Sequence, residues 1–198
     1  MKRMFRYASD QSLFLDLAPD ATDLHALFHI PGVVNIHPAY ASILLVFDPL
    51  RTSHDEVQRA AAAIQPPHSN APRPLHQIPI HYDGPDLDSL ARLHNLSPGR
   101  VIELHAAANY TVAFLGFVPG FAYLHGLPAA LATPRLPSPR KVVPAGSLGI
   151  AGDQTGIYPI ATPGGWQLIG HTTIELFNPH NVPMSLLQPG DRVKFIPA

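Results

Sequence analysis

Apolar and polar residues alternate in short segments over the first part of the chain. Segments with a two-residue period indicate strands, and segments with apolar residues three or four positions apart indicate helices. We expect strands at residues 12–18, 32–40 and 42–49, and helices at 20–30 and 53–64. Ser53 and Glu56 have the spacing of a capping box at the start of the second helix. The order strand, helix, strand, strand, helix predicts a ferredoxin-like α+β domain over residues 1–65.

A proline-rich stretch, QPPHSNAPRP at residues 65–74, follows this domain and contains no large apolar residue. It predicts a linker at 66–75. Beyond it we expect a strand at 77–82 and two helices at 86–96 and 97–107, the second capped by Ser97. Short apolar segments broken by Gly and Pro then indicate strands at 110–117, 141–150, 156–161, 165–170, 173–177 and 192–197. Many short strands predict a sandwich or barrel, so residues 76–198 form a mainly-β domain.

Glycine and proline are concentrated in the same part of the chain. Ten of the 14 glycines lie between residues 116 and 170, interleaved with eight prolines and with large apolar residues. Glycine permits tight turns and proline stiffens them, so these loops are either the walls of a binding site or simple barrel corners. Between Leu104 and Thr172 the only carboxylate is Asp153, whereas Arg135, Arg140 and Lys141 are all cationic. This imbalance favours an anionic ligand.

Composition limits the function classes. The formal net charge is −1, which argues against nucleic-acid binding. The chain has no cysteine, and we identify no signal peptide and no apolar run long enough to span a membrane, so we expect a cytoplasmic protein. Charged residues make up only 14% of the chain, which fits either a surface covered by a partner or a compositional bias.

Several chemical motifs are incomplete. GWQLIGHT (165–172) resembles a phosphate-binding loop, but His171 replaces the lysine and a strand-like segment follows instead of a helix. Ser147 lacks the surroundings of a nucleophile elbow, and we interpret it as a turn hydroxyl. The histidines are scattered without the spacing of a ligand set, so we expect no metal bound by this chain alone.

Three long stretches carry a family resemblance: LGFVPGFAYLHGLP, ATPRLPSPRKVVPAGSLGIAGDQTGIYP and PGGWQLIGHT. They closely resemble the B-subunit family of prokaryotic 5-oxoprolinases. The family also includes proteins known as allophanate hydrolase subunit 1, KipI-type inhibitors of a sensor histidine kinase, and the carboxyltransferase subdomain C and D of urea carboxylase. One departure is His171, because the family usually has arginine there. A second is the helix at 20–30, which looks shorter than in the family.

The resemblance implies a ferredoxin-like domain followed by a cyclophilin-like β-barrel. It also implies a heteromeric, ATP-dependent complex with 5-oxoprolinase subunits A and C that opens 5-oxo-L-proline to L-glutamate. This chain shows no convincing nucleotide site, so we expect a partner subunit to bind ATP.

The role that remains for this chain is to bind a small anionic substrate or intermediate. We predict a substrate-binding role for Arg135 and Arg140 as clamps, and for the backbone N–H groups of Gly146 and Gly149. The predicted catalytic residues are Gln154 as a hydrogen-bonding amide, Tyr158 as a donor or stacking wall, and His171 as a proton carrier. We expect these side chains to share one recess.

Two alternatives remain open at this stage. One is a KipI-type protein inhibitor that binds a histidine kinase. The other is an amidolyase subunit of the carboxyltransferase or allophanate hydrolase kind.

Overall fold

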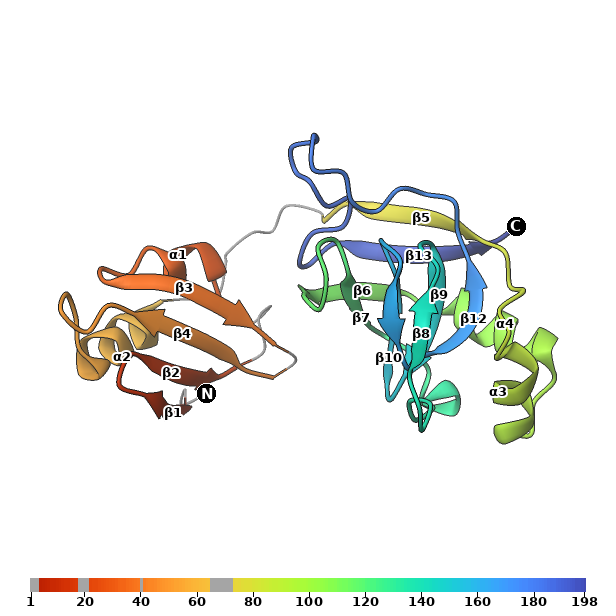
Figure 1. Cartoon of the computed structure of the whole chain (residues 1–198), viewed down its shortest axis with the longest axis horizontal. Coiled ribbons are helices and arrows are strands. Elements are labelled where there is room, and N and C mark those ends of the chain that lie inside the picture. The colour runs from red at the N-terminus through yellow and green to blue at the C-terminus, as the bar shows by residue number, and fades with distance from the viewer. Residues whose placement is uncertain (1–3, 18–21, 40, 65–72) are drawn as a thin grey trace. The chain divides into compact units, whose positions relative to one another are not determined.

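The computed structural model describes residues 4–17, 22–39, 41–64 and 73–198. The chain forms two compact units, Met1–Pro72 and Arg73–Ala198, each with its own hydrophobic core (Figure 1). The predicted mixture of α and β structure, with a barrel-like second part, is confirmed. Most of the predicted linker at 66–75 lies outside the described residues, and its last residue, Leu75, already belongs to a strand.

The first unit is an antiparallel sheet with strand order β1-β2-β4-β3 and two helices. Its elements are β1 (Met4–Ser9), β2 (Ser12–Asp16), α1 (Leu24–Phe28), β3 (Val33–Pro38), β4 (Ile43–Phe47) and α2 (His54–Ala63). The β3–β4 hairpin and helix α2 agree with the sequence pattern. Ser53 and Glu56 form both hydrogen bonds of the capping box. The ferredoxin-like assignment of this unit stays a prediction.

Two details of the first unit differ from the sequence pattern. Strand β1 was not predicted, because it carries mostly exposed residues and so lacks the alternation of a half-buried strand. Helix α1 has only five residues, with Asp23 as its N-cap. Residues 20 and 21, where we expected this helix to begin, lie outside the described residues.

The second unit is built on a seven-stranded sheet with the order β12-β9-β10-β7-β6-β13-β5. A bridge joins its two edge strands, because His81 and His171 exchange backbone hydrogen bonds of 2.9 and 2.8 Å. The sheet is therefore nearly closed into a barrel (Figure 1). Gly170 lets this seam close, since a Cβ there would lie 2.5 Å from the carbonyl oxygen of His81. We call this junction the seam.

The elements of this unit are as follows. The strands are β5 (Leu75–Ile80), β6 (Tyr110–Leu115), β7 (Ala122–His125), β8 (Arg140–Val143), β9 (Ser147–Ala151), β10 (Gln154–Ile157), β11 (Thr162–Gly164), β12 (Gln167–His171) and β13 (Arg192–Pro197). The helices are α3 (Leu87–Leu93), α4 (Pro98–Ala107) and the 3-10 turn η2 (Ala129–Leu131). Helix α3 packs beside β12 and α4 beside β13. Ser97 caps α4 as predicted.

The predicted strand pattern needs three corrections. The segment 141–150 is split between β8 and β9, because Gly146 turns the chain with a φ of +82°. The segment 173–177 is not a strand, since it takes part in β pairing only through an isolated bridge between Phe177 and Ser185. Strands β7 and β11 were missed, because Gly and Pro flank them closely.

A buried histidine ties several elements together. His105 of α4 is fully buried, and its Nε2 lies 3.1 Å from the Thr155 hydroxyl. The hydroxyl proton of Thr155 is donated to the carbonyl of Gly149, so Nε2 of His105 carries the proton in this pair. The Tyr82 hydroxyl donates to the other ring nitrogen over 2.9 Å. Burial lowers the pKa of His105 to about 3, which keeps the ring neutral.

Candidate functional site

The two-stranded ribbon of β8 and β11 contributes to two recesses of the second unit. Residues of β8 line one recess, and residues of β11 line the other. Arg140 and Val142 line one recess, whereas Val143 packs with the aromatic side chains beside the other. We call the first the seam recess, because it also contains His171, and the second the aromatic pocket.

The aromatic pocket is a cavity of about 280 Å³. Its aromatic lining consists of Phe117, Phe121, Tyr123, Tyr158 and Trp166, and Arg135 is its one charged lining residue. The ring of Trp166 lies edge-to-face with Phe121, with centroids 5.2 Å apart and planes at 89°. Such pairs stabilise one another beyond their burial, so the walls are rigid.

One wall residue has a strained backbone. Phe117 has a φ of +68°, a region that bulky side chains rarely adopt. The Val118 N–H donates to the carbonyl of Gly116 over 2.8 Å, so Phe117 is the central residue of a γ-turn. Phe117 is 57% exposed and lines the pocket. Strain of this kind is often concentrated at binding sites.

The electrostatics of the aromatic pocket favour an anion. Arg135 makes no hydrogen bond or ion pair with any residue that the structure describes. Burial raises the pKa of Tyr158, and a hydrogen bond from the Trp166 backbone and the charge of Arg135 offset part of that rise. Burial likewise raises the pKa of Tyr123, against the charge of Arg135. Both phenols therefore stay protonated near neutral pH and can act as donors.

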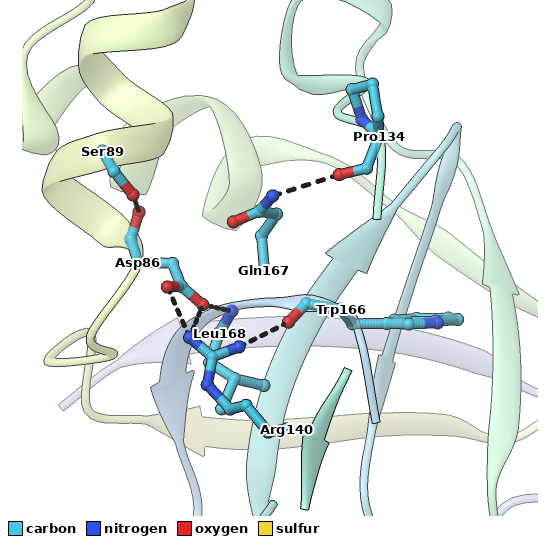
Figure 2. A network of polar contacts seen from close by, with 7 residues as sticks. All are labelled: Asp86, Ser89, Pro134, Arg140, Trp166, Gln167 and Leu168. Atoms are coloured by element: carbon cyan, nitrogen blue, oxygen red, sulfur yellow. Dashed lines mark hydrogen bonds and ion pairs between the residues drawn. The ribbon is translucent and has the colours of Figure 1, made fainter. Parts of the chain in front are cut away.

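The seam recess, about 460 Å³, has different electrostatics because Arg140 is already paired. Its Nη2 contacts both carboxylate oxygens of Asp86, at 2.6 and 2.8 Å. Its Nη1 donates to the carbonyl of Trp166 over 3.2 Å, and the Leu168 N–H donates to Asp86 over 2.6 Å. Figure 2 shows the Trp166 carbonyl directed at Arg140 while its indole ring points the other way. The pair thus fixes the backbone that carries the wall of the aromatic pocket.

His171 is also paired. Its Nδ1 lies 2.8 Å from a carboxylate oxygen of Asp83, and its ring is tilted against that of His81, with centroids 5.2 Å apart and planes at 32°. The side chains of His171 and Asp83 are 44% and 63% exposed, so their ion pair is a solvated contact at the seam. Ser147 also lines the recess and is the neighbour of His171 across the sheet. A histidine oriented by a carboxylate can carry a proton.

The structure divides the predicted site residues instead of gathering them in one recess. Arg135 and Tyr158 share the aromatic pocket, and Arg140 and His171 share the seam recess. Gln154 lines neither; it begins β10, and its side-chain nitrogen is buried without a partner in the described part of the chain.

The two predicted glycines are engaged by the barrel itself. The Gly146 N–H donates to the carbonyl of Tyr158 over 2.7 Å. Gly149 lies inside β9, where a Cβ would come within 3.0 Å of the Trp166 Cβ. Their roles, like those of the other site residues, stay predictions.

Within the described ranges, no group of three or more His, Cys, Asp or Glu side chains could hold a metal ion. Among those same residues, no helix is both long and apolar enough to cross a membrane.

Sequence reasoning missed two parts of this region. Phe117, Phe121 and Tyr123 were not predicted as site residues, although the GFVPGF stretch has the glycines and proline of a stiff turn. Asp86 is 82 positions away from its partner Leu168, so no local pattern could reveal it. A single buried carboxylate before an apolar helix resembles an ordinary N-cap.

Comparison with known proteins agrees with this architecture. Residues 9–187 match the family model "Carboxyltransferase domain, subdomain C and D". The chain is 45% identical over 176 residues to the 5-oxoprolinase B subunit of Escherichia coli O157:H7, covering 86% of this chain and 81% of that protein. It is 42% identical over 183 residues to the Bacillus subtilis protein of the same name, covering 84% and 76%.

Solved structures extend the comparison. The protein TTHA0988 aligns with a TM-score of 0.82 and 36% identity over 98% of this chain, but this chain spans only 40% of its length. The urea amidolyase of Kluyveromyces lactis aligns with a TM-score of 0.76 at 20% identity over 99% of this chain and 15% of that one, which indicates a shared fold. The chain therefore belongs to the carboxyltransferase subdomain C and D family, among the B subunits of 5-oxoprolinases.

Proposed function

We propose that this chain is the B subunit of an ATP-dependent 5-oxoprolinase complex, which opens 5-oxo-L-proline to L-glutamate. The proposal rests on one observation: the three stretches that resemble the 5-oxoprolinase B-subunit family lie together around one cavity. Phe117 and Phe121 come from the first stretch, Arg135 and Tyr158 from the second, and Trp166 from the third, and all five line the aromatic pocket. Signature residues that converge on one cavity are better explained by binding than by packing alone.

The chemistry explains why partners are needed. A lactam is an unreactive amide, and transfer of the terminal phosphoryl group of ATP to its oxygen, with release of ADP, makes the ring carbon electrophilic. Water then adds to that carbon, the ring C–N bond breaks to leave an acyl phosphate, and a second water hydrolyses it to L-glutamate and phosphate. We assign ATP, and any metal that accompanies it, to a partner subunit. The share of this chain is to hold the anionic substrate or intermediate and to stabilise its charge.

The individual roles follow from the surroundings of each side chain. Arg135 is the first candidate for an anion clamp, because it has no competing partner among the described residues. An anion at Arg140 would have to compete with Asp86. Tyr158 serves as donor and wall. His171 remains the proposed proton carrier, now with Asp83 as the group that orients it.

Gln154, Gly146 and Gly149 remain weaker candidates, since none of them lines the aromatic pocket. We further propose that residues 1–65 form a ferredoxin-like domain, that residues 76–198 form a cyclophilin-like barrel, and that the complex is cytoplasmic. Subunits A and C are the proposed partners.

The experiment is reconstitution. The chain is co-expressed with candidate A and C subunits, and glutamate release from 5-oxo-L-proline is measured with and without ATP. We expect ATP-dependent release that requires all three chains. Absence of release from a correctly assembled complex would refute the proposal, and release from an open-chain or urea-derived amide instead would favour the amidolyase alternative.

A further inference from the structure

We infer that the aromatic pocket binds 5-oxo-L-proline itself, as a flat ring bearing one carboxylate, with the carboxylate on Arg135 and the ring against Phe117, Tyr158 and Trp166. This inference rests on the proposed function for the identity of the ligand. Every residue that lines this pocket comes from the second unit of the chain.

The size and walls of the pocket suit a small ring. Its volume of about 280 Å³ falls just below the roughly 300–1,000 Å³ typical of drug-sized ligands. Phe117, Phe121 and Tyr158 pack edge-to-face with one another and all three line the cavity. The methylene groups of a lactam ring are apolar and fit such walls. Phe117, more than half exposed, would lose that exposure on binding.

The charge of the pocket selects a mono-anion. Arg135 is the one cation in the lining, and no lining residue is a carboxylate. A guanidinium binds a carboxylate through two parallel hydrogen bonds. The product, glutamate, adds a second carboxylate and an ammonium group, and the lining supplies neither a second cation nor a carboxylate to pair with them. The pocket should therefore prefer the closed lactam and release the opened product.

The amide of the ligand also has a partner. The Tyr158 phenol receives a hydrogen bond from the Trp166 backbone, and its own proton makes no hydrogen bond within the described part of the chain. That proton can be donated to the lactam carbonyl oxygen. Gly164 leaves room for this phenol, since a Cβ there would lie 2.5 Å from the Tyr158 hydroxyl oxygen.

The chain provides its own probe for the test, because Trp166 is its single tryptophan. The full chain is titrated with 5-oxo-L-proline while tryptophan emission is recorded. We expect a saturable change in emission. 2-Pyrrolidone, which lacks the carboxylate, and L-glutamate should each bind at least about tenfold more weakly, because a charge-assisted hydrogen bond is lost or left unmatched.

Two arginine variants separate a specific contact from a general charge effect. Arg135→Ala should weaken binding at least about tenfold. Arg92→Ala, at an exposed position on α3 outside both recesses, should leave the affinity unchanged. Circular dichroism checks that both variants are folded.

The outcomes distinguish the two claims. If 5-oxo-L-proline changes no emission and shows no heat of binding with either the chain or the ATP-free complex, while that complex turns over, the inference is wrong and the proposed function stands. Equal affinity of Arg135→Ala and the unaltered chain also overturns it. Binding that depends on Arg135 in a complex without turnover supports the site and refutes the function.

Discussion

Arg135 and Arg140 lie five positions apart in one proline-rich segment, yet the structure gives them opposite surroundings. Arg135 borders the aromatic pocket with no partner among the described residues. Arg140 is held by Asp86, which comes from the segment before α3. Arg135 can therefore bind an anionic ligand, whereas Arg140 already pairs with a carboxylate of this chain. A cation-rich stretch of sequence therefore identifies a site only after the carboxylates from distant segments are placed.

The largest effect should come from breaking the Asp86–Arg140 pair. Asp86→Ala leaves a mostly buried guanidinium and the Leu168 N–H without their acceptor, so we expect a loss of about 3–5 kcal/mol in the free energy of unfolding. Urea denaturation measures it. If Asp86→Ala unfolds at the same midpoint as the unaltered chain, Arg140 is not committed to this pair, and the contrast between the two arginines fails.

A smaller loss is expected from crowding the aromatic pocket. An alanine at position 164 places its Cβ 2.5 Å from the Tyr158 hydroxyl oxygen, so Gly164→Ala must displace the ring at a cost of about 1–3 kcal/mol. The matched control is Gly99→Ala on α4, where a Cβ meets nothing within 4 Å. Thermal unfolding compares the two variants. Equal stability of both variants would show that the Tyr158 ring can move aside without a measurable loss of stability.

His105 and His171 show a similar contrast, because His105 is fully buried whereas His171 is partly exposed. Burial lowers the pKa of His105 to about 3 from 6.5, so between these values the unfolded chain binds the extra proton and the folded chain does not. Stability should thus fall with decreasing pH below 6.5, with a contribution of about 1.4 kcal/mol per pH unit. Denaturation at a series of pH values measures this slope. His105→Gln should flatten it, and an unchanged slope would contradict the assignment.

The smallest effect is expected at the solvated pair of the seam. Because His171 and Asp83 are both substantially exposed, Asp83→Asn should change stability by no more than about 1 kcal/mol. In the assembled complex, the same variant tests the proton-carrier role of His171 through kcat, which should fall when Asp83 no longer orients the ring. An unchanged kcat would remove His171 from the proposed mechanism.

Much of the fold could be predicted because its signals are local. The capping box of Ser53 and Glu56 and the proline at the start of α4 lie within a few residues of the helices they begin. Strands β1, β7 and β11 were missed since they are short, exposed or flanked by glycine and proline, and they form through pairing with neighbours.

The candidate site was predicted only in part, for a related reason. Charge counting pointed to a cation-rich region but did not anticipate Asp86 or Asp83, which pair with Arg140 and His171 from the segment that follows β5. Phe117 and Tyr123 have the sequence character of core residues. Only the turn geometry of the GFVPGF stretch turns these rings toward a cavity.

The most direct test of the account is the kinetic effect of Arg135→Ala in the reconstituted complex, with Arg92→Ala as the control. We expect kcat/KM for 5-oxo-L-proline to fall by roughly 10- to 100-fold for Arg135→Ala, mainly through KM, while Arg92→Ala keeps the original value. An Arg135→Ala complex with the kcat/KM of the unaltered complex would contradict the claim that this free cation holds the substrate.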